Sequence, residues 1–453
     1  MAWTKRGIVG AIAGLCVLGG CSSTKSGSTT ATTAAAPATT AGAPVTPTTV
    51  SGGTGGATLP TVVVPPVTGD TTTGVTSTEI HVGGIYYKTD FGDGPEGFNA
   101  RLARQNAAGG IYGRKIVLDT MIDDGNDPNQ DLTAAKTLVQ EDHEFAVAPL
   151  FTEELGGANF LNDSKVPFFG WSVEPRWCDL NWGFGFWGND CDLTRAPLAL
   201  NFPPIAAKLF SDDTLKGHTV ALITGDVDSG RTAMLQFASV WRAGGAKVVL
   251  TDSSIPAPPA VVGDFTPYAE QILTANGGQP PDLLEILGDF GTTLGLDKKL
   301  IELGYKGIVL GYTDYDPRIV GTTKGMVTLL QYAPFESAPQ VPAIQQMISD
   351  LNAYKPGIPK TQAVESGWLT ADFLIKALLK AGPNLSREAL YNAINSGFTY
   401  DNGGVSVPVQ WPLGHQLIQV GDTFVQDEGT SYKVLVPLTP QGFIPNPFLT
   451  PSS

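Results

Sequence analysis

The sequence has 453 residues and a formal net charge of −15 at pH 7, with only 16% charged residues but 54 Gly and 34 Pro. A chain of this length exceeds one compact core and predicts two or three domains once its N-terminal tail is set aside. The acidic balance argues against nucleic acid or an anionic membrane surface as a partner, because either would require a basic face. The scarcity of charge and the many turn-forming residues are typical of exported proteins rather than cytosolic enzymes.

The N-terminus carries the pattern of a signal peptide. Lys5 and Arg6 precede an apolar run over residues 7–18, which is shorter than the roughly 20 residues of a membrane-spanning helix. The run ends in Leu18-Gly19-Gly20-Cys21, which resembles a bacterial lipobox. We therefore interpret residues 1–21 as a lipoprotein signal and Cys21 as the lipidation site, with an ordinary signal cleaved after small residues as the alternative. Lipidation would hold the protein on the outer face of the cytoplasmic membrane through the lipid anchor only.

Residues 22–77 consist almost entirely of Thr, Ala, Pro, Gly and Ser, with a few valines. A segment of this composition cannot bury enough apolar surface to fold, so we expect a disordered linker. Its root-mean-square reach of roughly 40 Å would keep a folded domain clear of a lipid surface.

After the linker, strand and helix patterns alternate. Strands are expected near residues 80–86, 116–122, 145–150 and 166–171, and helices near 96–108, 129–141 and 153–162. Gly109 and Gly110 can close the first helix, because glycine adopts the left-handed conformation that helix ends require. Asp127 can cap the second helix, with Pro128 in its first position. This alternation predicts a parallel sheet flanked by helices.

The stretch from Asn106 to Pro128 resembles a family signature. Asn106 is followed by Gly109-Gly110-Ile111 and by Gly113-Arg114, and later by Asp124 and Asp127-Pro128. Type I periplasmic binding proteins, the branched-chain amino acid group of ABC-transporter receptors, carry a similar N-x-x-G-G-I-x-G-R pattern followed by a D-x-x-D-P turn. The resemblance extends over about residues 78–440 and is most specific in its first part.

The resemblance implies an α/β fold with two doubly wound lobes, whose parallel-rich sheets are joined by a multi-strand hinge. Lobe one would comprise residues 78–202 and 332–397, lobe two residues 203–331 and 398–440 together with the hinge, and residues 441–453 would form a tail. Further strands are expected near 219–224, 247–251, 283–287, 307–310, 326–332, 405–409, 416–420 and 432–436, and helices near 231–243, 268–275, 292–303, 344–351 and 366–380.

Ligands of such sheets bind beyond the carboxyl ends of the strands. In lobe one, the candidate ligand-binding residues are Tyr86, Tyr87, Phe151, Thr152, Ser172 and Glu174. Alternation allows only one of the two tyrosines to face the cleft, and Thr152 could instead cap the following helix. Glu174 departs from the family's Ser-Ala-Thr segment and would repel a ligand carboxylate, unless it points to solvent or pairs with Arg176.

In lobe two, the candidates at strand ends are Asp228, Ser229, Asp289, Tyr312 and Asp314. Ser229 stands where relatives often carry an aromatic residue. Asp228 could contact a ligand ammonium or could equally cap the helix that follows it.

Cys178 and Cys191 are the only cysteines of the expected folded part, and an oxidising compartment predicts a disulfide between them. The loop between them contains Trp182, Phe184 and Trp187. These rings could form a lid over the cleft, or the loop could pack its own rings at the surface.

The sequence offers no constellation for catalysis. Its four histidines stand at isolated positions without metal-ligand spacing, and phosphate-loop, G-x-S-x-G and H-E-x-x-H motifs are missing. We therefore predict a monomeric, non-enzymatic receptor without metal or cofactor, which hands a small polar metabolite, such as an amino acid or amide, to the subunits of an ABC permease. The alternatives are an envelope sensor or protein-interaction module on the same fold and, as a weaker one, an envelope hydrolase.

Overall fold

The computed structural model describes residues 59–191, 198–256 and 260–446. The predicted signal peptide, the lipidation site Cys21, the first part of the linker and residues 447–453 lie outside these ranges. None of the helices within them combines the length and apolar character that crossing a bilayer requires.

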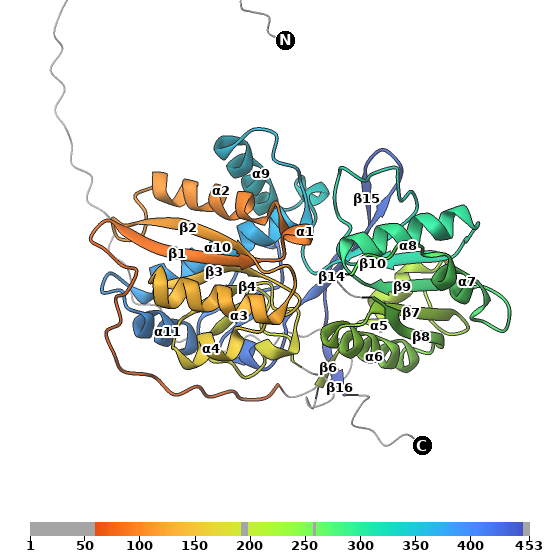
Figure 1. Cartoon of the computed structure of the whole chain (residues 1–453), viewed down its shortest axis with the longest axis horizontal. Coiled ribbons are helices and arrows are strands. Elements are labelled where there is room, and N and C mark those ends of the chain that lie inside the picture. Colours follow the sequence, from red (N-terminus) through yellow and green to blue (C-terminus); the bar gives the residue numbers. More distant parts are fainter. Residues whose placement is uncertain (1–58, 192–197, 257–259, 447–453) are drawn as a thin grey trace, which may run out of the picture. The chain divides into compact units, whose positions relative to one another are not determined.

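The first sheet has five parallel strands in the order β2-β1-β3-β4-β5 (Figure 1). Its central strand, β3, is buried along its whole length, as expected for a strand covered by helices on both faces. The strands are β1 (Glu79–Tyr86), β2 (Lys115–Asp123), β3 (Ala146–Phe151), β4 (Phe168–Gly170) and β5 (Gly183–Gly185). The connecting helices are α1 (Lys88–Phe91), α2 (Gly94–Ala107), α3 (Pro128–Lys136), which continues as a π turn over Thr137–Glu141, and α4 (Ala158–Asp163).

The local signals in this half are confirmed. Gly109 and Gly110 have positive φ angles of 104° and 69° at the end of α2. Asp127 caps α3, and its side chain accepts hydrogen bonds from the main-chain amides of Asn129 and Gln130.

The second sheet has seven strands in the order β15-β14-β11-β10-β9-β7-β8. The strands from β8 to β11 run parallel, and β14 and β15 add an antiparallel edge. The strands are β7 (Thr219–Gly225), β8 (Lys247–Ile255), β9 (Leu283–Leu287), β10 (Ile308–Gly311), β11 (Val327–Leu330), β14 (Gly421–Asp427) and β15 (Tyr432–Pro440). Helix α5 (Pro203–Ala206) precedes β7, and the helices between the strands are α6 (Asp228–Ala243), α7 (Thr266–Thr274) and α8 (Phe290–Glu302).

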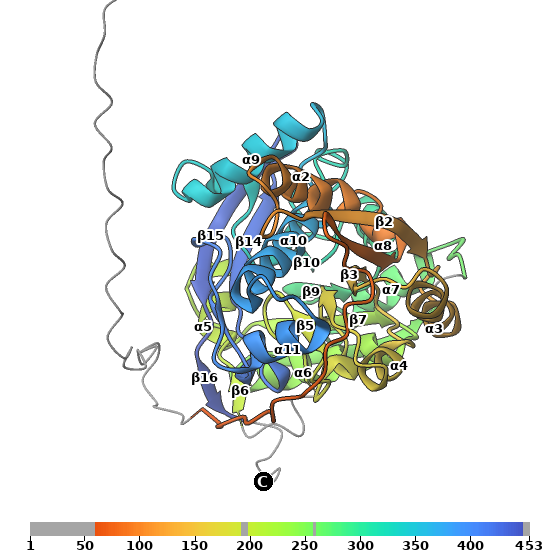
Figure 2. The same ribbon diagram turned by 90° about the vertical axis from the view of Figure 1, so that its left-hand side faces the viewer.

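The chain passes repeatedly between the two halves, which we call lobe one and lobe two after their sheets. After β11 it returns to lobe one, where α10 (Gln362–Ala381) packs against α2, β3 and β4, and α9 (Pro342–Tyr354) packs beside α2 (Figures 1 and 2). Helix α11 (Arg387–Asn395) packs against α10. Two short antiparallel strand pairs lie in the segments that pass between the lobes. They are β6 (Leu198–Leu200) with β16 (Phe443–Pro445) and β12 (Thr399–Tyr400) with β13 (Val409–Gln410). The predicted fold class, two parallel-rich α/β lobes, is confirmed.

The C-terminal part differs from the sequence expectation. Residues 416–420 are not a strand, because a 3-10 helix over Leu413–His415 precedes them and the amide of Gln419 bonds to the carbonyl of Trp187 at 2.7 Å. The strand predicted at 405–409 is reduced to the two residues of β13. The strand β14 begins at Gly421 instead, and it pairs with β11 from Thr423 to Gln426.

The linker also differs where it is described. Residues 65–71 contact α11 instead of running free of the domain. Asn392 bonds to both main-chain groups of Val67, accepting from its amide at 2.9 Å and donating to its carbonyl at 2.8 Å. Glu388 accepts from the amide and hydroxyl of Thr71, at 2.8 Å each. Hydrogen bonds to α11 thus hold in place a segment whose own composition has too few apolar residues to fold by itself.

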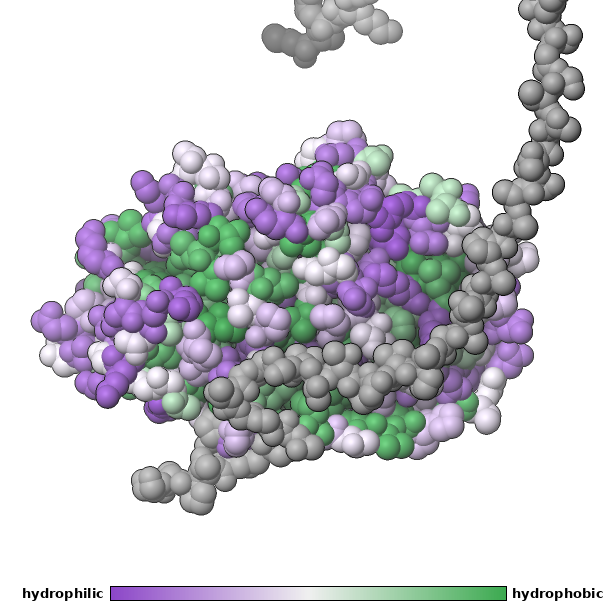
Figure 3. All heavy atoms as spheres, turned by 180° about the vertical axis from the view of Figure 1, so that it is seen from behind, coloured by the Kyte–Doolittle hydropathy of each residue, from purple (hydrophilic) through white to green (hydrophobic). Residues whose placement is uncertain are grey.

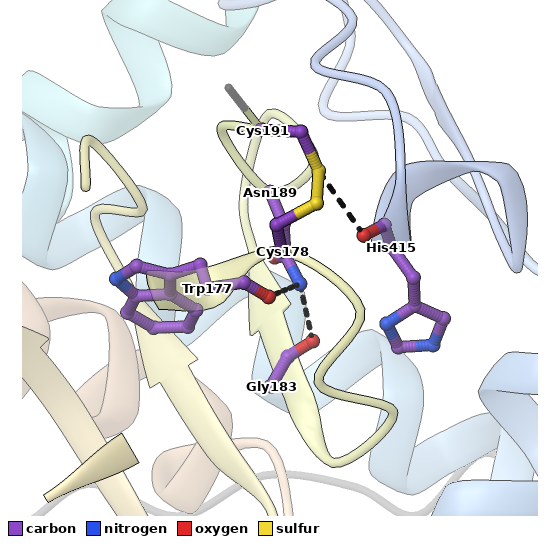
Figure 4. Close-up of a disulfide and its surroundings, with 6 residues drawn as sticks. All are labelled: Trp177, Cys178, Gly183, Asn189, Cys191 and His415. Carbon is purple, nitrogen blue, oxygen red and sulfur yellow. Dashed lines mark hydrogen bonds between the residues drawn. A yellow bond between two sulfur atoms is a disulfide. The ribbon is translucent and has the colours of Figure 1, made fainter. Parts of the chain in front are cut away.

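The predicted disulfide between Cys178 and Cys191 is present (Figure 4). Asn189 holds the loop inside the disulfide, because its side-chain amide donates to the carbonyls of Trp177 and Gly183, at 3.0 Å each. The aromatic rings of this loop are buried: Phe184 belongs to β5 and packs against Trp411. On the face drawn in Figure 3, hydrophilic and hydrophobic residues are interspersed, as is common for a surface in contact with water.

Candidate functional site

A cavity of about 210 Å³ lies where the carboxyl ends of the two sheets meet. Lobe one contributes residues that follow β2, β3, β4 and β5, and lobe two contributes residues that follow β7, β9 and β10 together with one face of α6. Segments that pass between the lobes close its side with Phe202, Ile418 and Val420. The cavity therefore has the position that small ligands occupy in open α/β sheets.

The walls of the cavity are mainly apolar and aromatic. On the lobe-one side, Trp171 and Trp187 have ring centroids 5.9 Å apart. On the other side, Phe237 lies between Phe202 at 5.5 Å and Tyr312 at 5.6 Å. Flat rings on both sides can cover an apolar molecule over a large area at little entropic cost.

Five buried polar atoms in the lining have no hydrogen-bond partner among the described residues. Three are donors: Nε1 of Trp171, Nε1 of Trp187 and Nε2 of Gln236. Two are oxygens, Oδ2 of Asp422 and Oε1 of Gln441, whose side chains meet through a 2.9 Å hydrogen bond between Gln441 Nε2 and Asp422 Oδ1. Buried polar groups are nearly always paired in folded proteins, so these five atoms lack the partners that such groups normally have.

Carboxyl groups are frequent around the cavity. Burial raises the pKa of Asp422 to about 7. Glu153 and Asp289 also line the cavity, and burial, followed by the charges of Asp90 and Asp289, raises the pKa of Glu153 well above its usual value. Among the lining residues within the described ranges, none is Lys, Arg or His.

Three of the residues predicted from the sequence line this cavity: Ser229, Asp289 and Tyr312. Asp289 is at the same time the N-cap of α8, where its Oδ1 accepts from the amide of Thr292 at 3.0 Å. The hydroxyl of Tyr312 donates to Glu285 in the interior, so only the ring is offered to the cavity.

The other predicted lobe-one residues lie outside the lining and have local partners. Ser172 donates to the carbonyl of Gly188. Thr152 accepts from the amide of Glu154 at 3.2 Å, and Glu174 pairs with Arg176 at 3.1 Å. Phe151 stacks on Phe91, with 5.4 Å between the ring centroids.

The two tyrosines at the end of β1 also lie outside the lining. Tyr87 is buried, and burial raises its pKa to about 12, whereas Tyr86 is half-buried. In lobe two, Asp228 is exposed and pairs with Arg231. Asp314 is buried and accepts from the hydroxyl of Thr328 at 2.6 Å. Ligand contact by these residues stays a prediction.

Sequence reasoning missed several lining residues. Gln236 could have been identified from the sequence, because a glutamine on the apolar face of an amphipathic helix is unusual. In the structure its side chain is only 7% exposed. Asp422 and Gln441 had no local signal, since they reach the cavity only through the late passage of the chain between the lobes. Trp187 belongs to the aromatic loop for which a lid was one interpretation, and it does line the cavity.

The fold and the cavity define a two-lobed binding protein for small solutes. A sequence model described as periplasmic binding protein matches residues 80–423, and the chain belongs to this family, of the branched-chain amino acid type found among ABC-transporter receptors. Its members and structural neighbours are solute-binding receptors rather than enzymes, and family membership implies a location outside the cytoplasm.

Solved structures share the fold at low sequence identity. A fatty acid ABC transporter substrate-binding protein from Thermomonospora curvata has a TM-score of 0.68 at 17% identity, covering 82% of this chain and 94% of its own. A possible leucine/isoleucine/valine-binding protein from Rhodopirellula baltica has a TM-score of 0.66 at 14% identity, with coverages of 80% and 97%. A solute-binding protein from R. palustris, in complex with benzoate, has a TM-score of 0.62 at 16% identity, with coverages of 80% and 97%. A search of curated proteins finds no match.

Proposed function

We propose that this protein is an extracytoplasmic receptor that binds a small solute between its lobes and delivers it to the subunits of an ABC permease. The proposal includes anchoring through a lipid on Cys21 and action as a monomer. Support comes from family membership, from the lipobox-like sequence and from a cavity lined by both lobes. A ligand that contacts both lobes favours the closed state, which is the state a permease can distinguish from the open one.

The observation that carries this proposal is the set of five buried polar atoms around an aromatic cavity. They would be satisfied by a molecule with an apolar body, at least one acceptor for the indole and amide donors, and at least one donor for Asp422 or Gln441. Amides, amines and related small metabolites meet this requirement. The ligands named for the neighbours, fatty acid and benzoate among them, show that this fold accommodates apolar bodies in those proteins.

A thermal-shift screen with a broad metabolite library tests the proposal. A ligand that binds only the folded state at one hundred times its Kd stabilises the protein by about 2.7 kcal/mol, so the melting temperature rises measurably. Ala233→Trp should abolish the shift, because Ala233 lines the cavity on α6 and an indole there would occupy it.

The matched control is Leu235→Trp. Leu235 lies on the same helix, but its side chain is 58% exposed and points away from the cavity lining, so this variant should keep the full shift. If well-folded protein gave no shift with any solute, the receptor role would fail and the sensor or interaction alternative would take its place.

A further inference from the structure

Three carboxyl groups from both lobes, here called the carboxyl trio, lie near one another: Glu153 and Asp289 line the cavity, and Asp90 lines a smaller polar cavity that shares Thr313 with it. Glu153 follows β3 in lobe one and Asp289 begins α8 in lobe two, and both line the cavity. Asp90, in α1, reaches across to lobe two, where its Oδ2 accepts from the amide of Phe290 at 3.2 Å. The trio therefore belongs to the contact between the lobes as well as to the ligand cavity.

Asp90 and Glu153 are poorly neutralised by the protein, whereas both carboxylate oxygens of Asp289 accept hydrogen bonds from Thr292. Asp90 Oδ1 is buried and has no hydrogen-bond partner among the described residues. Burial, and then the charge of Asp289, raises the pKa of Asp90 to about 7. The carboxylate of Glu153 accepts a hydrogen bond from the side-chain amide of Asn126 at 3.3 Å. Like charges held together out of water oppose closure of the lobes unless a proton or a cation compensates them.

Nearby cations are engaged elsewhere or exposed. Lys88 and Arg318 line a second, polar cavity of about 150 Å³ beside Asp90. Arg318 bonds to Asp316 at 2.6 Å and, across the lobes, to Asp93 at 2.7 Å. Lys88 is exposed. The pKa of Asp90 is raised by burial and then by the charge of Asp289, and Lys88 is not among the groups that shift it. Glu154, next to Glu153, pairs with Arg176 at 3.4 Å and adds further negative charge.

An aromatic surface adjoins the trio. Trp171 lines the cavity together with Glu153, and its ring lies 4.8 Å from that of Phe91 and 5.9 Å from that of Trp187. Carboxylates combined with the faces of tryptophan rings attract organic cations, since both present negative potential. A ligand carboxylate would instead meet repulsion from the same groups.

We propose that the ligand is an organic cation, an ammonium group on an aliphatic or aromatic body that also carries a neutral hydrogen-bond acceptor, whose positive charge lies against Asp90, Glu153 and Asp289 while its body occupies the aromatic cavity. The inference rests on the proposed receptor function and names the chemical class of its solute. Neutralisation of a trio contributed by both lobes would couple binding to closure.

Three probes with the same body test the charge preference: 2-phenylethylammonium, 2-phenylethanol and 3-phenylpropanoate. Calorimetric titration of the mature chain should give a Kd for the ammonium probe at least about tenfold lower than for the other two, because a hydrogen bond to a charged group contributes about 1.5–3 kcal/mol. Equal affinities, a preference for the propanoate, or no binding of the ammonium probe at millimolar concentration would each overturn the inference.

The pH dependence gives an independent readout. Between about pH 5.5 and about pH 8, a cation must displace protons from Asp90 and Glu153, whose pKa values are raised, so the affinity for the ammonium probe, which stays charged in this range, should rise with pH. A neutral ligand that accepts a hydrogen bond from a protonated carboxyl would show the opposite trend, which is the expectation for the alcohol. An affinity for the ammonium probe that falls with rising pH contradicts the proposal.

Asp289→Asn locates the effect within the trio. Asparagine caps a helix as well as aspartate does, so α8 should keep its N-terminus while the charge is lost. Binding of the ammonium probe should weaken about tenfold or more, and binding of the alcohol should change less than about twofold. Glu302→Gln, at the other end of α8 and paired only with Lys299 at the surface, is the matched control and should leave both affinities unchanged.

Failure of this inference is distinguishable from failure of the receptor role. If the ammonium probe does not bind but a neutral or anionic solute from the metabolite screen does, the cation assignment is wrong and the receptor function stands. If no solute of any charge binds, both fall together.

Discussion

Two glycines allow the closest helix contact of lobe one. A Cβ atom on Gly97 of α2 would lie 1.8 Å from the carbonyl oxygen of Val364, and one on Gly367 of α10 would lie 2.0 Å from that of Gly94. Because the neighbouring atoms belong to the main chain, no side-chain rotation can relieve either clash. The contact holds α10, which follows lobe two in the sequence, against the first sheet.

Gly97→Ala should therefore destabilise the protein. Alanine favours a helix over glycine by about 1 kcal/mol, but the overlap with Val364 forces a backbone shift, and overpacking of this kind costs about 1–3 kcal/mol or more. We expect a net decrease in the free energy of unfolding in urea. Gly263→Ala is the control, since a Cβ there meets no atom within 4 Å, and a Gly97→Ala variant as stable as this control would contradict the argument.

At the same scale, the sequence predicts the region of the site better than its individual residues. The expectation that ligands bind beyond the carboxyl ends of the strands selects Ser229, Asp289 and Tyr312, which do line the cavity. It also selects Glu174 and Asp228, whose carboxyl groups contact arginines two and three residues further along the chain. The rule specifies where a strand ends, but the direction of the side chain depends on neighbours that come together only in the folded protein.

At the scale of elements, the alternating pattern predicts the parallel strands from β1 to β4 and from β7 to β11, because buried parallel strands appear as short apolar runs. It fails for β14, where two acidic residues interrupt the run. Asp422 is held by Gln441 at 2.9 Å, and Asp427 accepts from the amide of Gly321 at 2.8 Å. These partners come from distant parts of the chain, so a local pattern could not reveal the strand.

The segment 65–71, which contacts α11, shows the same dependence on distant partners and allows a test. Asn392→Ala removes both hydrogen bonds to Val67. Their loss should lower the free energy of local opening of the segment by about 1–3 kcal/mol. Amide hydrogen exchange at Val67 and Thr71 should accelerate about tenfold or more, while exchange in β3 stays unchanged. Asn352→Ala, at an exposed position of α9, is the control. Unaltered exchange at Val67 would show that other contacts order the segment.

At the scale of the whole molecule, many acidic groups are buried in both lobes. Burial raises the pKa of Asp131 to about 8 and that of Glu174 to about 8, and in lobe two it raises the pKa of Glu285 and of Asp297 to about 7 each. The buried His415 behaves oppositely, since burial lowers its pKa to about 3. The stability of the free protein must therefore depend on pH.

The sign of this dependence follows from the protons that each state binds. Between about pH 6.5 and about pH 8, the native state retains part of the protons on these carboxyls that the unfolded chain has already released, so unfolding releases protons and the free energy of unfolding falls as pH rises. His415 is neutral in both states over most of this window and contributes little.

Urea unfolding of the ligand-free protein at both ends of the window should show higher stability at the lower pH. Asp131→Asn keeps the oxygen that accepts from the amide of Gly157 at 2.6 Å but cannot titrate, so this variant should lose part of the dependence. A stability that rises with pH in this window would mean that these carboxyls are ionised in the folded protein.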